Sequence, residues 1–149
     1  MRILGLDLGE ERIGVALSDP QGWLAAPLTV LPGKSFKAAL AAIEKMVVEH
    51  QVGRVVVGYP RSLDGTLGPQ AQRVDRHVEL LRSRLPVPVV LWDERLSTAQ
   101  AKRMIHEAGK RVRRDRIDAA AAAIILQSYL DAGLATEAPE ASARHCMEE

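Results

Sequence analysis

Two short apolar runs at the start of the chain, residues 3–8 and 13–17, constrain the fold more than any other feature. Each run has the length of a β-strand, and only residues 9–12 lie between them. So short a connection predicts that the two strands pair as an antiparallel hairpin. A third run, residues 23–31, contains Pro27, which cannot donate a ladder hydrogen bond, so we expect that strand at an edge or a bend of the sheet.

Helical and strand-like patterns alternate along the next part of the chain. Apolar residues recur at helical spacing over residues 36–47, which predicts an amphipathic helix that stops near Gly53. The β-branched run at 54–58 is typical of a central strand covered on both faces. Pro69 suits the first position of a second helix, and a further strand is expected at 87–92. Leading strands followed by alternation predict an α/β sheet of about five strands with helices packed on it.

Two more helices are expected near the end of this pattern. Ser97 and Gln100, three residues apart, form a capping box that opens a third helix, and Gly109 closes it. The last helix is expected from about residue 115 to 130, and it ends at Gly133.

Size and composition are those of one ordinary globular domain. The chain has 149 residues, of which 47% are hydrophobic and 26% charged, and this excludes global disorder and a fibrous architecture. We expect one domain at residues 1–133 and a flexible acidic tail at 134–149. Cys146 is the single cysteine, so no internal disulfide is expected. No stretch approaches the roughly 18 apolar residues of a membrane span, and the start of the chain lacks the pattern of a signal peptide, so we expect a cytoplasmic protein without membrane contact.

Nucleic-acid binding is indicated by local charge and not by the charge of the whole molecule. The formal net charge is +1, and an aromatic content of 3% argues against a single-strand binder built on stacked rings. Between Ala101 and Arg116, however, seven basic residues stand against two acidic ones. The basic residues of this stretch are Lys102, Arg103, Lys110, Arg111, Arg113, Arg114 and Arg116. The alternative interpretation is a solvated helix face and loop.

Asp7 is the first candidate for chemistry, because an aspartate inside an apolar strand is costly to bury unless something compensates its charge. Strand alternation puts Ile3, Gly5 and Asp7 on one face, so the carboxylate emerges near the end of the strand. A metal ion is one compensating partner. Backbone amides at a turn are the alternative.

Asp93 and Glu94 end the strand at 87–92 and bring a second pair of carboxylates to the edge of the sheet. Alternation groups Asp93 with Leu91 and Glu94 with Trp92, and it leaves open which of these faces carries the first aspartate. A structural role is the alternative for Asp93, which can pair with Arg95 or accept backbone hydrogen bonds.

Asp118 falls in the first turn of the expected last helix, where an acidic residue interacts favourably with the exposed amides and the helix dipole. That ordinary role would suffice for Asp118 taken alone. Asp115 already offers a cap, however, and a second acid on a helix anchored by the apolar run at 119–126 has the rigid support that a metal ligand requires.

Carboxylates gathered in this way suit phosphodiester hydrolysis with Mg²⁺ or Mn²⁺. Two such cations about 3.5 to 4 Å apart stabilise both the attacking and the leaving oxygen, and oxygen ligands suffice to hold them. The four histidines show no zinc-like spacing, and the sequence has neither a Walker loop nor a Gly-x-Ser-x-Gly elbow. His106 is a candidate for an assisting base, with an ordinary surface position on a helix as the alternative.

Four segments together resemble the YqgF/RuvX family. They are LGLDLGEERIGVALSD at residues 4–19, VVGYPRSLDGTLGPQA at 56–71, DERLSTAQA at 93–101 and RIDAAAAAIILQSYLD at 116–131. The resemblance implies a ribonuclease H-like fold of the RuvC type, with a mixed sheet and helices on both faces. It also implies a metal-dependent nuclease, in a family described both as Holliday junction resolvases and as factors that mature the 5′ end of 16S rRNA precursors.

Position by position, the resemblance implies that Asp7, Glu94 and Asp118 are the catalytic metal ligands for Mg²⁺ or Mn²⁺, with Asp93 a weaker candidate. The expected nucleic-acid contacts are Arg12, Arg61, Arg95, Lys102, Lys110, Arg111, Arg113 and Arg114. The expected partner is structured RNA or branched DNA, bound by a monomer or a homodimer. His77 departs from the family pattern, because such sequences often carry an apolar aromatic residue at that position.

Two other functions fit parts of the pattern. A nucleotide-binding domain of the actin, Hsp70 and sugar-kinase group also uses a strand aspartate followed by glycine, as at residues 7–9, but it needs two such domains and this chain supplies one. A non-catalytic RNA-binding factor for ribosome assembly is the second alternative. In that case the acids serve folding, and the basic stretch binds the RNA.

Overall fold

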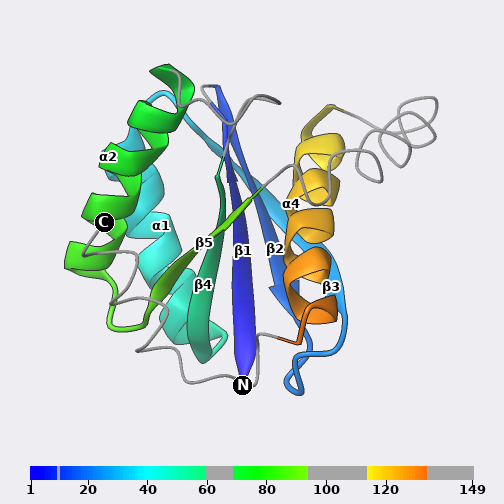
Figure 1. Cartoon of the computed structure of the whole chain (residues 1–149). Helices are drawn as coiled ribbons and strands as arrows, with labels where there is room; N and C mark the ends of the chain where they lie inside the picture. Colours follow the sequence, from blue (N-terminus) through cyan, green and yellow to red (C-terminus); the bar gives the residue numbers. More distant parts are fainter. Residues whose placement is uncertain (10, 60–68, 94–113, 134–149) are drawn as a thin grey trace.

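A five-stranded mixed sheet forms the centre of the molecule (Figure 1). The computed structural model describes residues 1–9, 11–59, 69–93 and 114–133. The strands are β1 (Arg2–Leu8), β2 (Arg12–Ser18), β3 (Ala25–Pro32), β4 (Val52–Tyr59) and β5 (Val89–Asp93). Their order across the sheet is β3-β2-β1-β4-β5, with β1, β4 and β5 parallel and β2 antiparallel to both of its neighbours. The expected hairpin and the expected five-stranded sheet are both confirmed.

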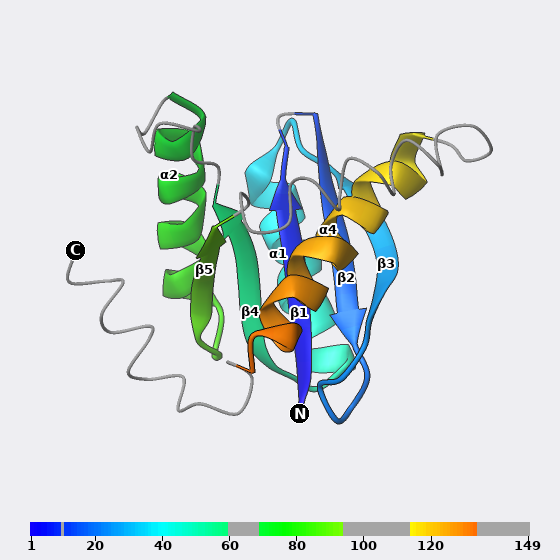
Figure 2. The same cartoon turned by 45° about the vertical axis from the view of Figure 1, so that its right-hand side comes forward.

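Helices cover both faces of this sheet, as expected. Helices α1 (Phe36–Glu49) and α2 (Pro69–Arg84) lie on one face, and α4 (Arg114–Asp131) crosses β1, β2 and β3 on the other (Figures 1 and 2). Pro69 opens α2 as the sequence predicted. Gly133 follows α4 with a φ of +77°, a conformation in which glycine carries no steric penalty. No helix of the described ranges is long and apolar enough to cross a membrane.

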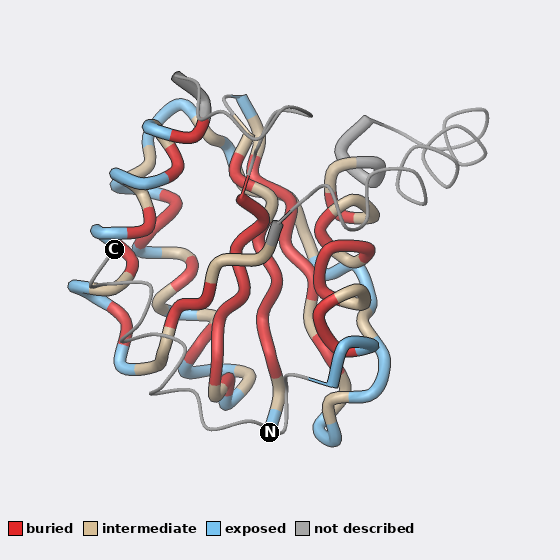
Figure 3. The backbone as a smooth tube through the Cα atoms, viewed as in Figure 1, coloured by how far each residue is buried: buried red, intermediate tan, exposed pale blue. Residues whose placement is uncertain are grey.

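The alternation of side chains along the strands divides the interior into two hydrophobic clusters. Figure 3 shows that buried residues run along the central strands and along the helices packed on them. In β1, Leu4, Leu6 and Leu8 pack against α1 and α2, whereas Ile3 packs against α4. Gly5 also faces α4, because a β-carbon there would lie 2.8 Å from the β-carbon of Leu126. Helix α4 therefore lies unusually close to β1, and its distance from the strand is set by a residue without a side chain.

Strand β3 forms the edge of the sheet, as Pro27 predicted. The register of β2 and β3 shifts between Val15 and Ala16, where Pro27 pairs with Ala16. The strand begins two residues later than the apolar run, because the amides of Trp23 and Leu24 donate to the carboxylate of Asp19, 2.7 and 3.0 Å away. These backbone hydrogen bonds lower the pKa of Asp19.

The first helix ends earlier than expected. We expected it to stop near Gly53, but α1 ends at Glu49 and Gly53 lies inside β4. The chain turns at Gln51, whose φ is +54°, and the amide of His50 caps the helix by donating to the carbonyl of Met46. The sequence does not indicate where this helix ends, because a glutamine adopts the left-handed backbone conformation that glycine usually takes.

His77 takes the place of an aromatic residue in the packing of α2 against α1. Its ring stacks on Phe36 with ring centres 3.9 Å apart and planes 2° from parallel. The departure from the family pattern thus preserves an aromatic contact. The predicted third helix at 97–109 and the tail at 134–149 lie outside the described residues.

Candidate active site

The candidate site lies at the edge of the sheet where the parallel strands β1, β4 and β5 end. The first described turns of α4 reach the same edge, which is the upper one in Figure 1. In open α/β sheets, ligands bind outside the carboxyl ends of the strands. Asp7 stands next to the last residue of β1 and is partly buried. It alternates with Ile3 and Gly5 and therefore lies on the α4 face.

Asp118 reaches this edge from α4. A β-carbon on Gly14 would overlap the carbonyl oxygen of Asp118, so the main chain of α4 rests directly on β2 at this point. Gly14 is also the residue of β2 that pairs with Asp7 of β1. Because paired residues of adjacent strands lie about 4.5 to 5.5 Å apart between Cα atoms, Asp7 and Asp118 share one end and one face of the sheet.

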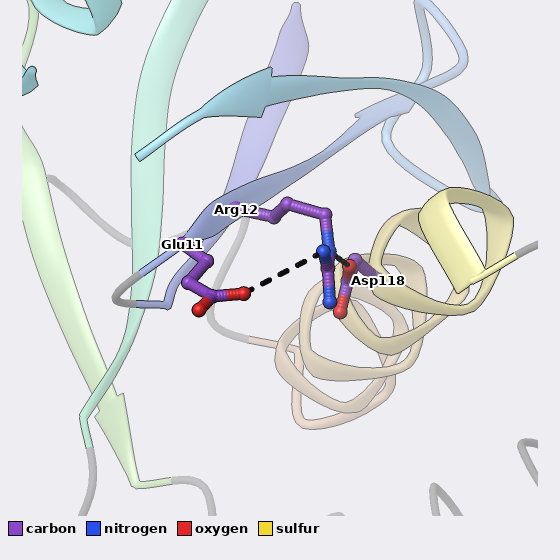
Figure 4. Close-up of polar contacts among 3 residues, drawn as sticks. All are labelled: Glu11, Arg12 and Asp118. Carbon is purple, nitrogen blue, oxygen red and sulfur yellow. Dashed lines mark hydrogen bonds and ion pairs between the residues drawn. The ribbon is translucent and has the colours of Figure 1, made fainter. Parts of the chain in front are cut away.

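The carboxylate of Asp118 is bound by Arg12, the first residue of β2 (Figure 4). The Nε of Arg12 donates to Oδ2 of Asp118 at 2.6 Å, and Glu11 lies 3.9 Å from the same guanidinium. The Arg12 and Asp118 side chains are 34% and 29% exposed, so the pair is partly withdrawn from solvent. We expected Arg12 among the nucleic-acid contacts, and the structure adds an ion pair with a candidate metal ligand.

The expected position of Asp118 in the first helical turn is wrong. Helix α4 begins at Arg114, so Asp118 is its fifth residue and lies beyond the first turn. The partner of its carboxylate is therefore a side chain from β2 and not the exposed amides of the helix start. The ordinary interpretation of Asp118, contact with the exposed amides and the dipole of the first helical turn, therefore does not describe its position.

The turn between β1 and β2 is held by Arg73, a residue of α2 that the sequence analysis did not single out. Its Nη2 donates to the carbonyl of Leu8 at 3.2 Å and its Nη1 to the carbonyl of Gly9 at 3.3 Å. The amide of Gly9 donates to the carbonyls of Asp7 and Arg12. An arginine on an amphipathic helix carries no local signal for such a contact, because its partners stand more than 60 residues away in the sequence.

Strand β5 shows which face its alternating residues take. Val89 and Leu91 belong to the cluster under α1 and α2, whereas Val90 and Trp92 belong to the cluster under α4. The indole of Trp92 donates to the hydroxyl of Ser128 on α4 at 3.1 Å. The α4 face, which carries Asp7 and Asp118, is therefore the face of Trp92.

Several predicted site residues lie beyond what the structure describes. The main chain of Asp93 pairs with Tyr59 at the end of β5, and nothing further is described for its side chain. Arg114 begins α4, again without a described side chain. The remaining candidates outside the described residues are Glu94, Arg61, Arg95, Lys102, His106, Lys110, Arg111 and Arg113.

The residues present fit a hard divalent cation. Two aspartates come from rigid elements to one place, and carboxylate oxygens are the ligands that Mg²⁺ and Mn²⁺ prefer. Within the described ranges no group of three such residues is found. A cavity of about 460 Å³ lies at the opposite end of the sheet, lined by Met1, Trp23 and Leu130 among others, and is not part of this site.

Comparison with known proteins identifies the family. The profile of the family described as "RuvX: Holliday junction resolvase" matches residues 1–132. A protein of Thermoanaerobacter pseudethanolicus is 45% identical over 134 residues, covering 88% of this chain and 96% of the relative. One of Caldanaerobacter subterraneus subsp. tengcongensis is 47% identical over 134 residues, with the same two shares covered. Both relatives bear the name "Putative pre-16S rRNA nuclease".

Solved structures agree in fold. RuvC of Thermus thermophilus in complex with its Holliday junction substrate superimposes with a TM-score of 0.59 at 19% identity, covering 93% of this chain and 99% of that one. The Holliday junction resolvase of fowlpox virus gives a TM-score of 0.56 at 12% identity, covering 89% and 99%. The predicted RuvC-type architecture is confirmed, and from its first strand to the end of α4 the chain belongs to the RuvX family.

Proposed function

We propose that this RuvX-family nuclease hydrolyses phosphodiester bonds in structured nucleic acid, with Mg²⁺ or Mn²⁺ held by Asp7, Glu94 and Asp118. One observation carries the proposal: Gly14 pairs with Asp7 on one side and supports the main chain of Asp118 on the other. Two aspartates that stand 111 positions apart in the sequence thereby lie at one end and on one face of the sheet. A shared cation would compensate the repulsion between two neighbouring carboxylates.

Glu94 is the third ligand that we propose, in preference to Asp93. Trp92 lies on the α4 face together with the two aspartates, and Leu91 lies on the other. Side chains alternate along a strand, so sequence alternation predicts the face of Trp92 for Glu94 and the face of Leu91 for Asp93. The packing of β5 therefore supports Glu94 over Asp93 as the third ligand.

In the proposed mechanism Asp7, Glu94 and Asp118 would hold the cation, and the chemistry that it would supply when bound is activation of water and stabilisation of the charge that develops on the phosphate. The protein residues supply position and charge. Asp7 is fixed by strand pairing, and Asp118 by α4 and by the bond from Arg12 to its Oδ2 atom. This bond orients the Asp118 carboxylate, as residues around a metal centre orient the ligands that they contact. The basic residues proposed to bind nucleic acid neutralise phosphates, which makes binding sensitive to salt.

Precursor 16S rRNA is the substrate that we propose first, with trimming at its 5′ end. Relatives 42 to 47% identical over 134 or 135 residues bear a name that specifies this RNA. A Holliday junction is the second candidate, because RuvC of the same fold was solved with that substrate. The two differ in assembly: one cut at an RNA end needs one active site, whereas symmetric cuts across a junction need a homodimer. We place the reaction in the cytoplasm, without a membrane partner.

The decisive experiment replaces Asp7 with asparagine, a change that removes a charge and keeps the shape. Wild-type protein and Asp7→Asn are incubated with a pre-16S rRNA fragment and with a four-way DNA junction, in Mn²⁺, in Mg²⁺ and in EDTA. We expect cleavage by the wild type in metal only, at least a hundredfold loss in the variant, and retained binding in a mobility-shift assay.

Asp131→Asn is the matched control, because Asp131 is an exposed carboxylate at the other end of α4 that accepts from Gln127. Its cleavage should equal that of the wild type. A wild-type protein that binds these nucleic acids and cuts neither of them in either metal would favour the non-catalytic RNA-binding factor. Solution mass measured on the same samples distinguishes a monomer from a homodimer.

A further inference from the structure

Arg73 connects the far side of the sheet to the main chain that carries Asp7. It belongs to α2, which packs on the face opposite α4, and its guanidinium reaches over the end of β1. The two Nη groups donate to the carbonyls of Leu8 and Gly9, the two residues that follow Asp7. Among the residues that the structure describes, Arg73 forms no ion pair with an acidic side chain.

With these two bonds, every main-chain carbonyl of residues 7–9 has a donor. The carbonyl of Asp7 accepts from the amide of Gly9, and the next two carbonyls accept from Arg73. A planar guanidinium with its donors in a fixed fork holds two neighbouring carbonyls in one geometry. The end of β1 is therefore fixed from one face by Arg73 while its carboxylate emerges on the other.

Fold stability alone does not account well for this arrangement. The Nε of Arg73 is buried and has no hydrogen-bond partner among the described residues, which is a cost to the folded state. Its two hydrogen bonds, 3.2 and 3.3 Å long, are at or beyond the long end of the usual range. The contact does fix the position of the main chain at Leu8 and Gly9, directly after Asp7.

We propose that Arg73 is a positioning residue of the nuclease: it fixes the β1–β2 turn so that the Asp7 carboxylate is held where it binds the divalent cation. This inference rests on the proposed function, because it assigns Arg73 a role in the same site. Residues that orient metal ligands without touching the metal typically change metal affinity by about 10- to 100-fold when replaced. Arg73 acts through the main chain and is not itself catalytic.

Arg82 supplies a matched control on the same helix. Its Nε and Nη2 donate to the carbonyl of Val89 at 3.3 and 2.9 Å, at the beginning of β5 and thus at the opposite end of the sheet from the site. Both arginines therefore extend from α2 and donate to main-chain carbonyls at one end of a strand. Only Arg73 does so beside a proposed metal ligand.

The test compares Arg73→Gln, Arg73→Lys and Arg82→Gln with the wild type in the full chain. Urea unfolding measures stability, titration calorimetry measures Mn²⁺ binding directly, and single-turnover cleavage of the pre-16S rRNA fragment and of the junction is followed over a Mn²⁺ series. For Arg73→Gln we expect a Kd for Mn²⁺ about tenfold higher and cleavage that excess Mn²⁺ partly restores. Arg73→Lys keeps the charge and can reach one carbonyl, so its Kd for Mn²⁺ should lie between those of the wild type and of Arg73→Gln.

Arg82→Gln should lose a similar amount of stability while its Mn²⁺ affinity and its metal dependence of cleavage stay at wild-type values. The inference is overturned if Arg73→Gln, or Arg73→Lys where the glutamine variant does not fold, binds Mn²⁺ as tightly as Arg82→Gln does. A wild-type protein that neither binds Mn²⁺ nor cleaves would instead overturn the proposed function, and the role of Arg73 with it. Mn²⁺ binding and cleavage by the wild type therefore distinguish a failure of the proposed function from a failure of the role of Arg73.

Discussion

The carbonyl oxygen of Asp118 rests against the α-carbon of Gly14, where no β-carbon can be accommodated. Gly14 is at the same time the partner of Asp7 in the β1–β2 ladder. Gly14, a residue without a side chain, thus sets how closely α4, which carries one acid, approaches β2, the strand paired with the one that carries the other acid. The geometry of the candidate site depends on backbone packing before any side chain is considered.

Replacing Gly14 with alanine should therefore damage the site more than the fold. The added methyl group overlaps the Asp118 carbonyl, and α4 has to move away from β2 at its N-terminal part. Overpacking of this kind costs about 1 to 3 kcal/mol of unfolding free energy. We expect a loss of that size in urea unfolding, together with at least a tenfold lower kcat/KM for cleavage.

Gly5→Ala is the control for this substitution. Its β-carbon would lie 2.8 Å from the β-carbon of Leu126, two turns further along α4 from Asp118, so it presses on the same helix away from the site. A comparable loss of stability with a smaller loss of cleavage is expected. Equal losses of cleavage in both variants would show that the position of Asp118 on Gly14 has no special importance.

The Arg12–Asp118 pair should contribute more to cleavage than to stability. With both side chains about one third exposed, solvent screening limits the pair to about 1 kcal/mol or less. Arg12→Gln removes the donor that holds Oδ2 of Asp118, so we expect this small loss of stability together with markedly slower cleavage. Double-mutant cycles with Asp118→Asn should give a nonzero coupling energy in unfolding.

Arg84→Gln is the matched control for Arg12→Gln. Arg84 forms an ion pair of 2.7 Å with Glu44 between α2 and α1, with 54% and 33% exposed side chains. The Arg84→Gln variant should lose a similarly small amount of stability and should cleave at the wild-type rate. Slow cleavage in the Arg84 variant would point to a general effect of lost ion pairs and not to a role of Arg12 in the site.

The part of the site that could be predicted from the sequence is the part that depends on local pattern. Asp7 stood out because a charged residue interrupts an apolar strand, and its face followed from alternation with Ile3 and Gly5. The fold followed from the order of apolar runs in the same way. Such signals extend over a few residues, which is why they are visible without a structure.

The part that could not be predicted depends on contacts between distant residues. Arg12 and Asp118 stand 106 residues apart, and Arg73 stands 64 and 65 residues from the carbonyls that it binds. No spacing rule connects such positions, and an arginine on a helix or at the start of a strand is ordinary. The early end of α1 escaped prediction for a different reason, because Gln51 adopts a φ of +54° without the glycine that usually indicates it.

His77 should make stability depend on pH in a defined window. Burial, followed by the charges of Arg73 and Arg76, lowers the pKa of His77 below its ordinary value of 6.5. Above about pH 6.5 the ring is neutral in both the folded and the unfolded state, and it does not affect stability. As the pH falls below 6.5 the unfolded chain takes up the proton first, so stability is lost until the lowered pKa is reached.

His77→Phe tests this prediction, because phenylalanine keeps the stack on Phe36 and cannot titrate. Urea unfolding between about pH 7 and pH 5 should show a decrease of stability in the wild type that exceeds the decrease in the variant. Parallel curves for the two proteins would show that protonation of His77 is not linked to folding. The variant also removes the buried Nδ1, which has no partner among the described residues, so it should be at least as stable as the wild type at pH 7.

Neighbouring acids at the end of β5 give the sharpest test of the site, because they differ mainly in the face that alternation assigns them. Trp92 contacts Ser128 on the α4 side, and the next side chain along the strand is expected on the opposite side. Glu94→Gln should therefore lower cleavage at least a hundredfold and weaken Mn²⁺ binding, whereas Asp93→Asn should retain most of both. Both substitutions remove one charge and preserve shape, so differences in net charge or folding cancel in the comparison. If Asp93→Asn abolishes cleavage and Glu94→Gln does not, the third ligand comes from the other face, and the site assigned to the α4 side has to be redrawn around Asp93.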